Sequence, residues 1–572
     1  MKRHFSIDTF LGIASLLLIT LTLNVYAAGC GKRDDNSKRS KLDTAKITPS
    51  ADIPYKEGET IKGRVTCNGE AVANVEVSDG IEVTQTDRNG VYHLPSKKKY
   101  GYVFISVPSG YEVSLKGNTP QFFQLLVSPS AKVERHDFIL TKVDNSRHAI
   151  LAVTDFHLCN RSNLDDLGQF QKVAGDINAT ATELRGKGYK VYAVSMGDES
   201  WDQYWYKNNL DIAGAMQKMQ IVNAPLFHCL GNHDNDPYCA DDWQSEQPFI
   251  RLFPAYYSFN AGNNHYIVLD DVQYVNEGAS EGHLGQRNYN ACIIGEELAW
   301  LKKDLALLKD KNQCIVVAMH IQLFNEPNIT NGVEDAARYR LDNHDEFVQA
   351  FSGFSNVHLL TGHTHVNYSV DVLPNIREHN TASICATWWW TGKLSGGKQH
   401  ICRDGSPGGY GVYLSDATNF SWYYKGYAKN KNYQFRTYDL NSVYMEDHGN
   451  STSVFRKYVH GYNQHRSDNE ILINVFNYDN KWKVEASEGG KPLMVTRIYS
   501  YDPLHVLCYN MARYNEDGAE PTSGFDTAKT NHLFRCYASE ATSTVNIKVT
   551  DEFGNVYMET MTRPKAFDEN ME

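Results

Sequence analysis

The chain has 572 residues and a formal net charge of −12 at pH 7. This length exceeds that of one ordinary hydrophobic core, so we expect about two to four domains. The acidic balance argues against a nucleic-acid-binding protein, which usually presents a basic face. Aromatic residues are plentiful, with 35 Tyr and 9 Trp, and this suits β-rich domains.

The N-terminus has the pattern of an export signal. Lys2 and Arg3 precede an apolar run, FLGIASLLLITLTLNVY, which is shorter than a comfortable membrane span. The small residues of AAGC come directly before Cys30, as in a bacterial lipoprotein signal. Residues 31–50 are polar, as in a flexible tether. We therefore expect residues 1–30 to be a signal peptide and Cys30 to carry a lipid that anchors the protein to a membrane.

An ordinary secretory signal, cut after Ala28 or Gly29, is the alternative interpretation of this segment. Export in either form would permit disulfides among the ten cysteines beyond Cys30. None of them forms a CxxC metal or redox motif. Cys229 and Cys314 lie in apolar, strand-like runs, so we expect them to be small buried hydrophobic residues.

Turn residues divide the next part of the chain into short strands. Asn-Gly or Asp-Gly pairs at residues 68–69, 79–80 and 89–90 interrupt an alternation of apolar and polar residues between 61 and 140. The pattern predicts a small β-sandwich over residues 51–145. It resembles the carboxypeptidase-regulatory-like modules found in front of exported enzymes, and it contains no cluster of catalytic residue types.

From residue 148 the predicted strands alternate with helices. Buried-strand runs such as HAILAVTD and KVYAVSMGD are followed by segments with apolar residues at helical spacing, such as LDDLGQFQKVAGDINATATEL. This alternation predicts an α/β domain over residues 146–400. From residue 408 short β patterns return, and they predict a C-terminal β-rich domain over residues 401–572, whose start the pattern leaves open between residues 385 and 470.

Polar residues of one chemical kind follow five of the predicted α/β strands. They are Asp155, His157, Asp198, Asn232, His320, His363 and His365. Ligands of open α/β sheets bind beyond the carboxyl ends of the strands, so we expect these side chains to converge. Carboxylates, an amide oxygen and imidazoles suit Zn, Mn or Fe, and the set is too rich in nitrogen for Ca²⁺ or Mg²⁺ alone.

Seven ligands are too many for one ion, and two ions that share one bridging carboxylate fit that number. Two metals roughly 3.5–4 Å apart can activate a bridging hydroxide and clamp the oxygens of an in-line displacement at phosphorus. Each motif alone is a weak signal, since a lone HxH is more often structural than a ligand. Their joint occurrence, each after an apolar run, favours a dinuclear metal centre.

The order D-x-H, GD, GNHD, H, GHxH resembles that of the calcineurin-like metallophosphoesterase family over about residues 148–366. The resemblance implies a four-layer α/β core, in which a β-sandwich is flanked by helices, and a hydrolase of phosphate mono- or diesters. It also implies which residues hold each ion. The first would be bound by Asp155, His157 and His365, the second by Asn232, His320 and His363, with Asp198 as the bridge.

The same resemblance gives His233 a role outside the metal shell. In the family, this histidine is paired with the acid after it, here Asp234, and it faces the phosphate and protonates the leaving oxygen. The second block of the family often reads GDxxD. Here it reads GDESWD, so Asp202 lies one position late.

The flanking β-domains make the chain similar to exported calcineurin-like phosphoesterases of Bacteroides-type bacteria. The segments TWWWTGK and DGSPGGYGVY fit that subgroup. This similarity implies a lipid-anchored enzyme in the cell envelope of a Gram-negative bacterium, at the outer membrane or in the periplasm. The plainer interpretation of Trp388, Trp389 and Trp390 is packing between domains. Three consecutive strand residues cannot all face one way, so at least one is a candidate for the site lining.

Two alternatives to ester hydrolysis remain open. One is a pyrophosphatase acting on nucleotide or sugar diphosphates, and the other is an inactive, lipid-anchored binding or scaffold protein whose site has decayed. Completeness discriminates against the second, because a decayed site usually loses ligands and all seven are present together with His233. The expected partners are a phosphate-ester substrate and a membrane, with no nucleic acid.

Overall fold

The computed structural model describes residues 52–129, 131–394, 399–417 and 419–571. The predicted signal peptide, Cys30 and the tether lie outside these residues. Within the described part of the chain, no helix has the length and apolar character needed to cross a membrane.

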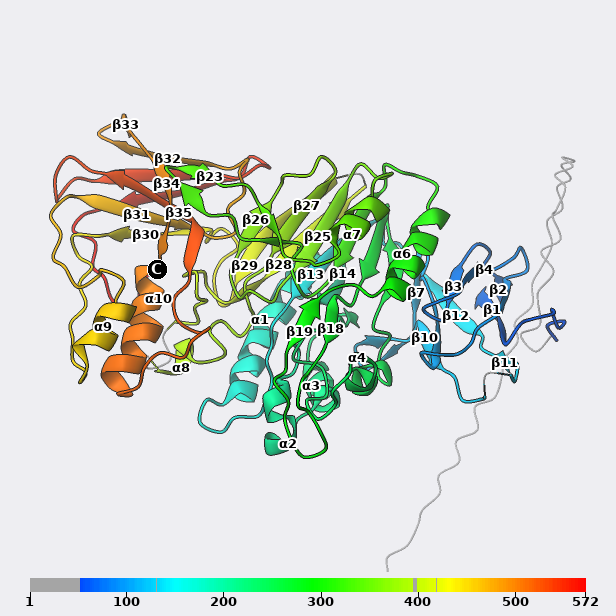
Figure 1. The fold of residues 1–572 in the computed structure, drawn as a ribbon. Helices are drawn as coiled ribbons and strands as arrows, with labels where there is room; N and C mark the ends of the chain where they lie inside the picture. Colours follow the sequence, from blue (N-terminus) through cyan, green and yellow to red (C-terminus); the bar gives the residue numbers. More distant parts are fainter. Residues whose placement is uncertain (1–51, 130, 395–398, 418, 572) are drawn as a thin grey trace, which may run out of the picture. The chain divides into compact units, whose positions relative to one another are not determined.

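The first part of the described chain folds into two β-sheets (Figure 1). The six strands of the first are β1 (Ile61–Cys67), β2 (Glu70–Ala71), β5 (Val91–Leu94), β7 (Tyr111–Val113), β11 (Glu134–Arg135) and β12 (Phe138–Lys142). The four strands of the second are β3 (Glu76–Ser78), β4 (Val83–Gln85), β6 (Tyr102–Ile105) and β10 (Phe123–Leu125). The N-terminal β architecture predicted from the alternation is therefore confirmed.

The first sheet of the central domain has the order β15-β14-β13-β28-β29. Its strands are β13 (Arg147–Val153), β14 (Lys190–Ser195), β15 (Leu226–Phe227), β28 (Gly409–Asp416) and β29 (Asn419–Gly426). The strands β13, β14 and β15 are parallel, and β28 runs antiparallel to β13.

This topology places β28 and β29, which lie beyond residue 400, in the central sheet. Residues 409–426, which the sequence pattern assigned to the C-terminal domain, complete the central sheet, where Leu151 of β13 lies opposite Val412. A short alternating strand has the same pattern in either domain. Its pairing partner is therefore decided by the tertiary structure.

The second central sheet has the order β16-β17-β20-β25-β27-β26. Its strands are β16 (Tyr257–Ala261), β17 (Asn264–Val268), β20 (Cys314–Ala318), β25 (Val357–Thr361), β26 (Tyr368–Val370) and β27 (Ile376–Asn380). From β17 to β27 the neighbouring strands are parallel, whereas β16 and β26 are antiparallel edges.

Helices cover the two central sheets. They are α1 (Asp166–Gly186), α3 (Ile212–Met219), α6 (Gly295–Leu307) and α7 (His344–Ala350). Ile150 and Ala152 of β13 join the hydrophobic core shared with the second sheet, α6 and α7, while Leu151 and Val153 pack with α1 and α3. Successive residues of a strand point to opposite faces, so β13 is buried on both. The predicted mixed α/β core, a β-sandwich flanked by helices, is confirmed.

The C-terminal part consists of two antiparallel sheets and a helical layer (Figure 1). The strands are β30 (Phe435–Asp439), β31 (Glu470–Val475), β34 (Thr496–Tyr501) and β35 (Lys529–Tyr537), then β32 (Lys483–Glu488), β33 (Lys491–Leu493), β36 (Val545–Thr550) and β37 (Val556–Met561). Ile471 and Ile473 of β31 pack on Ile547 of β36, and Leu472 faces the helices. These helices are α9 (Thr452–Tyr458), α10 (Pro503–His505) and the π-helical η2 (Val506–Glu516).

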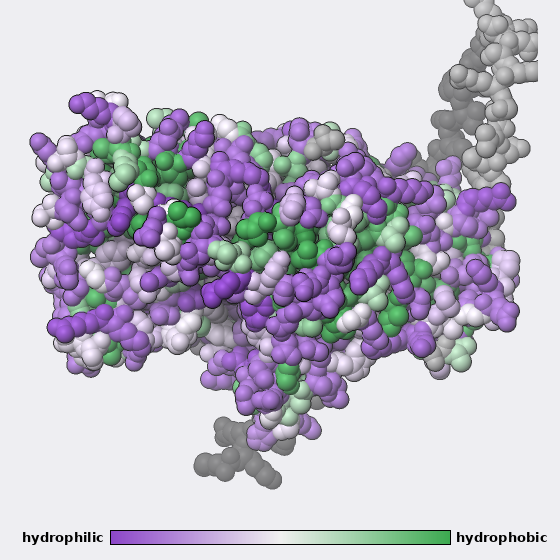
Figure 2. All heavy atoms as spheres, turned by 45° about the horizontal axis from the view of Figure 1, so that its top comes forward, coloured by the Kyte–Doolittle hydropathy of each residue, from purple (hydrophilic) through white to green (hydrophobic). Residues whose placement is uncertain are grey.

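Shorter elements complete the fold. They are β8 (Leu115–Lys116), β9 (Thr119–Pro120), η1 (Asp202–Tyr204), α2 (Trp205–Asn208), α4 (Asp242–Ser245), α5 (Gln247–Ile250), β18 (Val272–Tyr274), β19 (Tyr289–Ala291), β21 (Phe324–Asn325), β22 (Ile329–Thr330), β23 (Val333–Glu334), β24 (Arg338–Tyr339) and α8 (Thr391–Leu394). The face drawn in Figure 2 is mainly hydrophilic, with smaller hydrophobic patches.

Candidate metal centre

The seven predicted ligands come from the carboxyl ends of five strands. Asp155 and His157 follow β13, Asp198 follows β14 and Asn232 follows β15. In the second sheet, His320 follows β20, and His363 and His365 follow β25. Because the strands within each sheet are parallel here, their ends lie at one edge.

Three of the side chains form a first buried group. The Nε2 atoms of His157 and His365 lie 2.9 Å apart. Asp155 Oδ1 lies 3.2 Å from His365 Nε2 and 3.7 Å from His157 Nε2. This oxygen is buried and has no hydrogen-bond partner among the described residues. A buried carboxylate oxygen without a donor is costly, so the group fits a bound cation.

Three others form a second group. His320 Nε2 lies 3.0 Å from Asn232 Oδ1 and 3.1 Å from His363 Nδ1. The Tyr289 hydroxyl lies 3.0 Å from His363 Nε2, on the other side of that ring. Two imidazole nitrogens and an amide oxygen converge here, a donor set that suits a transition metal such as Zn or Mn.

Asp198 lies between the two groups. Its Oδ2 is 3.2 Å from His320 Nε2 in the second group and 3.7 Å from His157 Nε2 in the first. Its Oδ1 accepts the backbone N–H of His233 at 2.8 Å. The structure therefore brings all seven predicted ligands together, with the Asp198 carboxylate between the two groups.

The backbone at these positions is strained. Five of the seven residues have a left-handed φ although none is glycine: Asp155 (55°), His157 (44°), Asp198 (53°), His363 (69°) and His365 (59°). Each such residue costs about 1–3 kcal/mol, and positions of this kind concentrate at functional sites. The packing of the two sheets therefore holds these residues in strained conformations that direct their side chains into the centre.

Two glycines are required by close approach. A Cβ on Gly231 would lie 2.1 Å from the Asp198 nitrogen, and a Cβ on Gly362 would lie 2.0 Å from Thr154 Oγ1. Real Cβ atoms do not come this near, so the turns before Asn232 and His363 tolerate no side chain. The glycines of GNHD and GHTH therefore let the strand ends meet.

Within the centre, carboxylates and imidazoles stabilise each other's charged forms. Burial alone would raise the pKa of Asp155, but His365 and His157 hold that pKa well below its ordinary value. Burial alone would lower the pKa of His320, yet Asp198 raises it to about 10. Burial would also raise the pKa of Asp198, but His320 and His233 hold that pKa below its ordinary value. Both carboxylates are therefore ionised at neutral pH, and a metal ion would take the place of the proton on His320.

His233 is more exposed than the neighbouring His157. Its side chain is 23% exposed, against 1% for His157, and the centroids of the two rings lie 5.2 Å apart. His233 Nδ1 lies 2.8 Å from Asp202 Oδ1. Burial opposes protonation of His233, but Asp198 and Asp202 raise its pKa. Asp202 is in turn held by Arg287 Nη1 at 2.9 Å.

The expected pairing of His233 with Asp234 is corrected by these contacts. Asp234 is buried and accepts the backbone N–H of Ser200 at 2.8 Å and that of Gly231 at 3.0 Å. Asp234 therefore joins two loops. The acid that contacts the imidazole of His233 is Asp202. The signal was present in the sequence as the second acid of GDESWD. The one residue by which GDESWD is longer than GDxxD lies before the 3₁₀ turn η1, which begins at Asp202.

The sequence did not determine which aromatic side chains surround the centre. Trp388 stacks on His365, with ring centroids 3.8 Å apart, and Phe525 stacks on Trp388 at 4.1 Å. Trp389 is buried, and its indole N–H donates to the carbonyl oxygen of Phe156 at 2.8 Å. Of these two tryptophans, Trp388 therefore contacts the site and Trp389 belongs to the core. Phe525 comes from the C-terminal part, and no local pattern could reveal it.

Three family models match the sequence in succession. They are described as the N terminal of calcineurin-like phosphoesterase over residues 59–143, calcineurin-like phosphoesterase over 148–367, and the C terminal of calcineurin-like phosphoesterase over 378–557. The chain belongs to the calcineurin-like phosphoesterase family. It is accordingly a hydrolase of the metallophosphoesterase type, with clusters of His and Asp that could hold metal ions. Comparison with the curated proteins gives no match.

Comparison with solved structures finds distant similarity to a phosphatase and to two proteins described as 5′-nucleotidases. A dimetal phosphatase from Danio rerio is 11% identical, with 49% of this chain and 97% of that chain covered and a TM-score of 0.33. A putative 5′-nucleotidase from Staphylococcus aureus is 12% identical, with 60% and 74% covered and a TM-score of 0.32. A 5′-nucleotidase from Candida albicans is 12% identical, with a TM-score of 0.29. That alignment covers 50% of this calcineurin-like phosphoesterase and 52% of the Candida chain.

Proposed function

We propose that this calcineurin-like phosphoesterase hydrolyses phosphate mono- or diesters at a dinuclear centre. The position of Asp198 between the two buried groups carries the proposal. Asp155, His157 and His365 would hold one ion and Asn232, His320 and His363 the other, with Asp198 shared. The ions would be Mn, Zn or Fe. When bound, they would supply the positive charge that activates water and stabilises the phosphoryl oxygens.

His233 is proposed as the general acid. Its Nδ1–H donates to Asp202, which fixes the ring orientation and leaves Nε2 to carry the proton for the leaving oxygen. Its backbone N–H is anchored on Asp198, so the imidazole is held at a constant place beside the metal ligands. The partial exposure of the ring would let a substrate reach it from solvent.

Hydrolysis of p-nitrophenyl phosphate and of bis-p-nitrophenyl phosphate tests the proposal. With Mn²⁺ or Zn²⁺ added to the metal-free protein, we expect turnover of at least one of the two esters, and chelation should abolish it. The ratio of the two rates separates a monoesterase from a diesterase. Asp198→Asn is the matched control, because any activity that persists in it comes from a contaminant. Absence of turnover with every metal would favour the binding-protein alternative.

We also propose that a lipid on Cys30 tethers the enzyme to a membrane of a Gram-negative cell envelope. The apolar run and the AAGC sequence before the polar segment support this. Detergent phase partitioning compares the wild type with Cys30→Ser in cells that process lipoproteins. The wild type should enter the detergent phase and the variant should stay in the aqueous phase. Recovery of both in the aqueous phase would identify the signal as an ordinary secretory one.

A further inference from the structure

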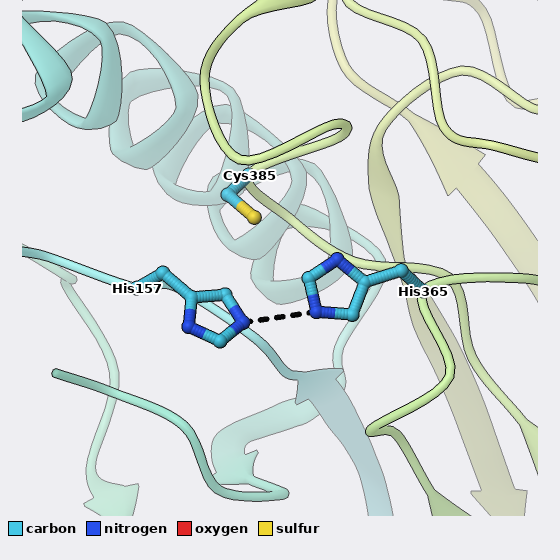
Figure 3. A group of neighbouring side chains, drawn as sticks. All are labelled: His157, His365 and Cys385. Atoms are coloured by element: carbon cyan, nitrogen blue, oxygen red, sulfur yellow. Dashed lines mark hydrogen bonds between the residues drawn. The ribbon is translucent and has the colours of Figure 1, made fainter. Parts of the chain in front are cut away.

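Cys385 lies beside the first group of metal ligands. Its sulfur, one ring nitrogen of His157 and one ring nitrogen of His365 all lie within 4.8 Å of one another. Figure 3 shows the thiol pointing from its loop toward the two imidazoles. All three side chains are buried. A sulfur atom therefore lies close to one ring nitrogen of each of two predicted ligands of the first ion.

A buried cysteine is usually a small hydrophobic residue, so a second observation is needed. Asp155 Oδ1 supplies it, because this buried oxygen has no hydrogen-bond partner among the described residues and lies 3.2 Å from His365 Nε2. The Cys385 backbone N–H donates to the carbonyl oxygen of Asp155 at 3.4 Å. The cysteine is thus attached to the loop that carries Asp155, whose Oδ1 has no hydrogen-bond partner among the described residues.

The backbone around Cys385 is strained in the same way as that of the ligands. Ala386, Trp388 and Trp389 have φ values of 52°, 47° and 67°, a region that bulky residues seldom adopt. The strained loop holds Trp388 flat on His365, with the rings 18° from parallel. The conformation that places the sulfur near the nitrogens also covers them with an indole, and strain of this kind is typical of a functional loop.

The thiol has a weak partner in the protein. Its Sγ lies 3.7 Å from the carbonyl oxygen of Ala386, and a thiol is a weak hydrogen-bond donor. Loss of the S–H proton would therefore sacrifice little hydrogen bonding. A soft sulfur ligand prefers Zn²⁺ or Fe to Mn²⁺, whereas oxygen and nitrogen ligands discriminate less.

We propose that Cys385 is a sulfur ligand of the ion held by Asp155, His157 and His365, and that it makes this position selective for Zn²⁺. The inference rests on the proposed two-metal function. On binding, the thiol proton passes to water and a metal–sulfur bond forms, with no change of oxidation state. The second position, with oxygen and nitrogen donors alone, would remain open to Mn²⁺.

Cobalt titration of the metal-free full chain tests the ligand directly. Co²⁺ bound to a thiolate gives a near-ultraviolet charge-transfer band in addition to the visible bands of the ion. We expect this band in the wild type at one equivalent per chain and its loss in Cys385→Ser. The matched control is Cys314→Ser, since Cys314 is also buried but begins β20, at the end opposite to His320. This control should keep the band.

Competition between metals gives a second readout. Cys385→Ser should lower Zn²⁺ affinity at the first position by at least about tenfold, because even residues that only support a ligand usually cost about 10–100-fold in metal affinity. Mn²⁺ affinity should change much less. An equal loss for both metals would indicate damage to the site and would contradict a ligand role.

The remaining outcomes separate this inference from the function on which it rests. If the wild type binds two Co²⁺ ions without the charge-transfer band, Cys385 is not a ligand and the dinuclear centre stands. If it binds no Co²⁺, the two-metal function itself fails. Should Cys385→Ser not fold, zinc X-ray absorption of the wild type decides without a variant. It must show one sulfur at about 2.3 Å, and a shell of nitrogen and oxygen alone would overturn the proposal.

Discussion

Asp198→Asn is expected to release both metal ions, because this carboxylate lies between the two groups of ligands. An amide keeps the shape of the side chain but loses the negative charge that two cations would share. Residues that merely support a ligand cost about 10–100-fold in metal affinity, so we expect a loss above about 100-fold for each ion. Ester hydrolysis should fall with metal occupancy.

Metal analysis of the purified variants measures this result. The wild type should hold two ions per chain and Asp198→Asn fewer than one. His157→Ala is the matched comparison, since His157 belongs to the first group and its loss should chiefly empty one position. A wild-type protein that never holds more than one ion per chain would contradict the dinuclear centre.

His233→Ala is expected to lower kcat by about 10²–10⁴-fold, the usual contribution of general acid catalysis. The loss should be large for an alkyl phosphate ester, whose leaving alkoxide needs a proton. It should be small for a nitrophenyl ester, because nitrophenolate leaves without one. Metal content should stay intact. Equal losses on both leaving groups would assign His233 to phosphate binding, and loss of metal would place it among the ligands.

Two carboxylates next to His233 provide a paired test of the corrected dyad. Asp202→Asn should reproduce the leaving-group pattern of His233→Ala on a smaller scale, because Asp202 orients the imidazole. Asp234→Asn should instead lower the free energy of unfolding by about 1–3 kcal/mol, since Asp234 accepts buried backbone N–H groups from two loops. A reversal of these two phenotypes, measured by kinetics and by denaturant unfolding, would restore the pairing expected from the sequence.

Much of the site could be predicted because its signals are local. An apolar run followed at once by Asp155, Asp198, His320 or His363 marks both a buried strand and its polar end. Parallel strands then place those ends at one edge without further information. The helical spacing of Phe170, Val173, Ile177 and their neighbours likewise fixed a buried face of α1 in advance.

The contacts that could not be predicted join residues that lie far apart in the sequence. Phe525 reaches Trp388 from the C-terminal part, and Cys385 meets His157 across more than two hundred residues. β28 joins β13 across a similar gap. Contacts of this kind depend on how whole sheets pack, and no periodicity or motif within a short window encodes them.

The sequence by itself determined which residues are candidate metal ligands, the order in which the strands present them, and the family to which the chain belongs. Local apolar patterns and short motifs are enough for this, since each strand carries its own ligand. Only the tertiary structure decided that Asp202 orients His233 while Asp234 joins loops. It alone placed Asp198 between the two groups and a thiol beside the first. The physical reason is that a side chain's role follows from its partners in space, and those are set by the packing of the two sheets.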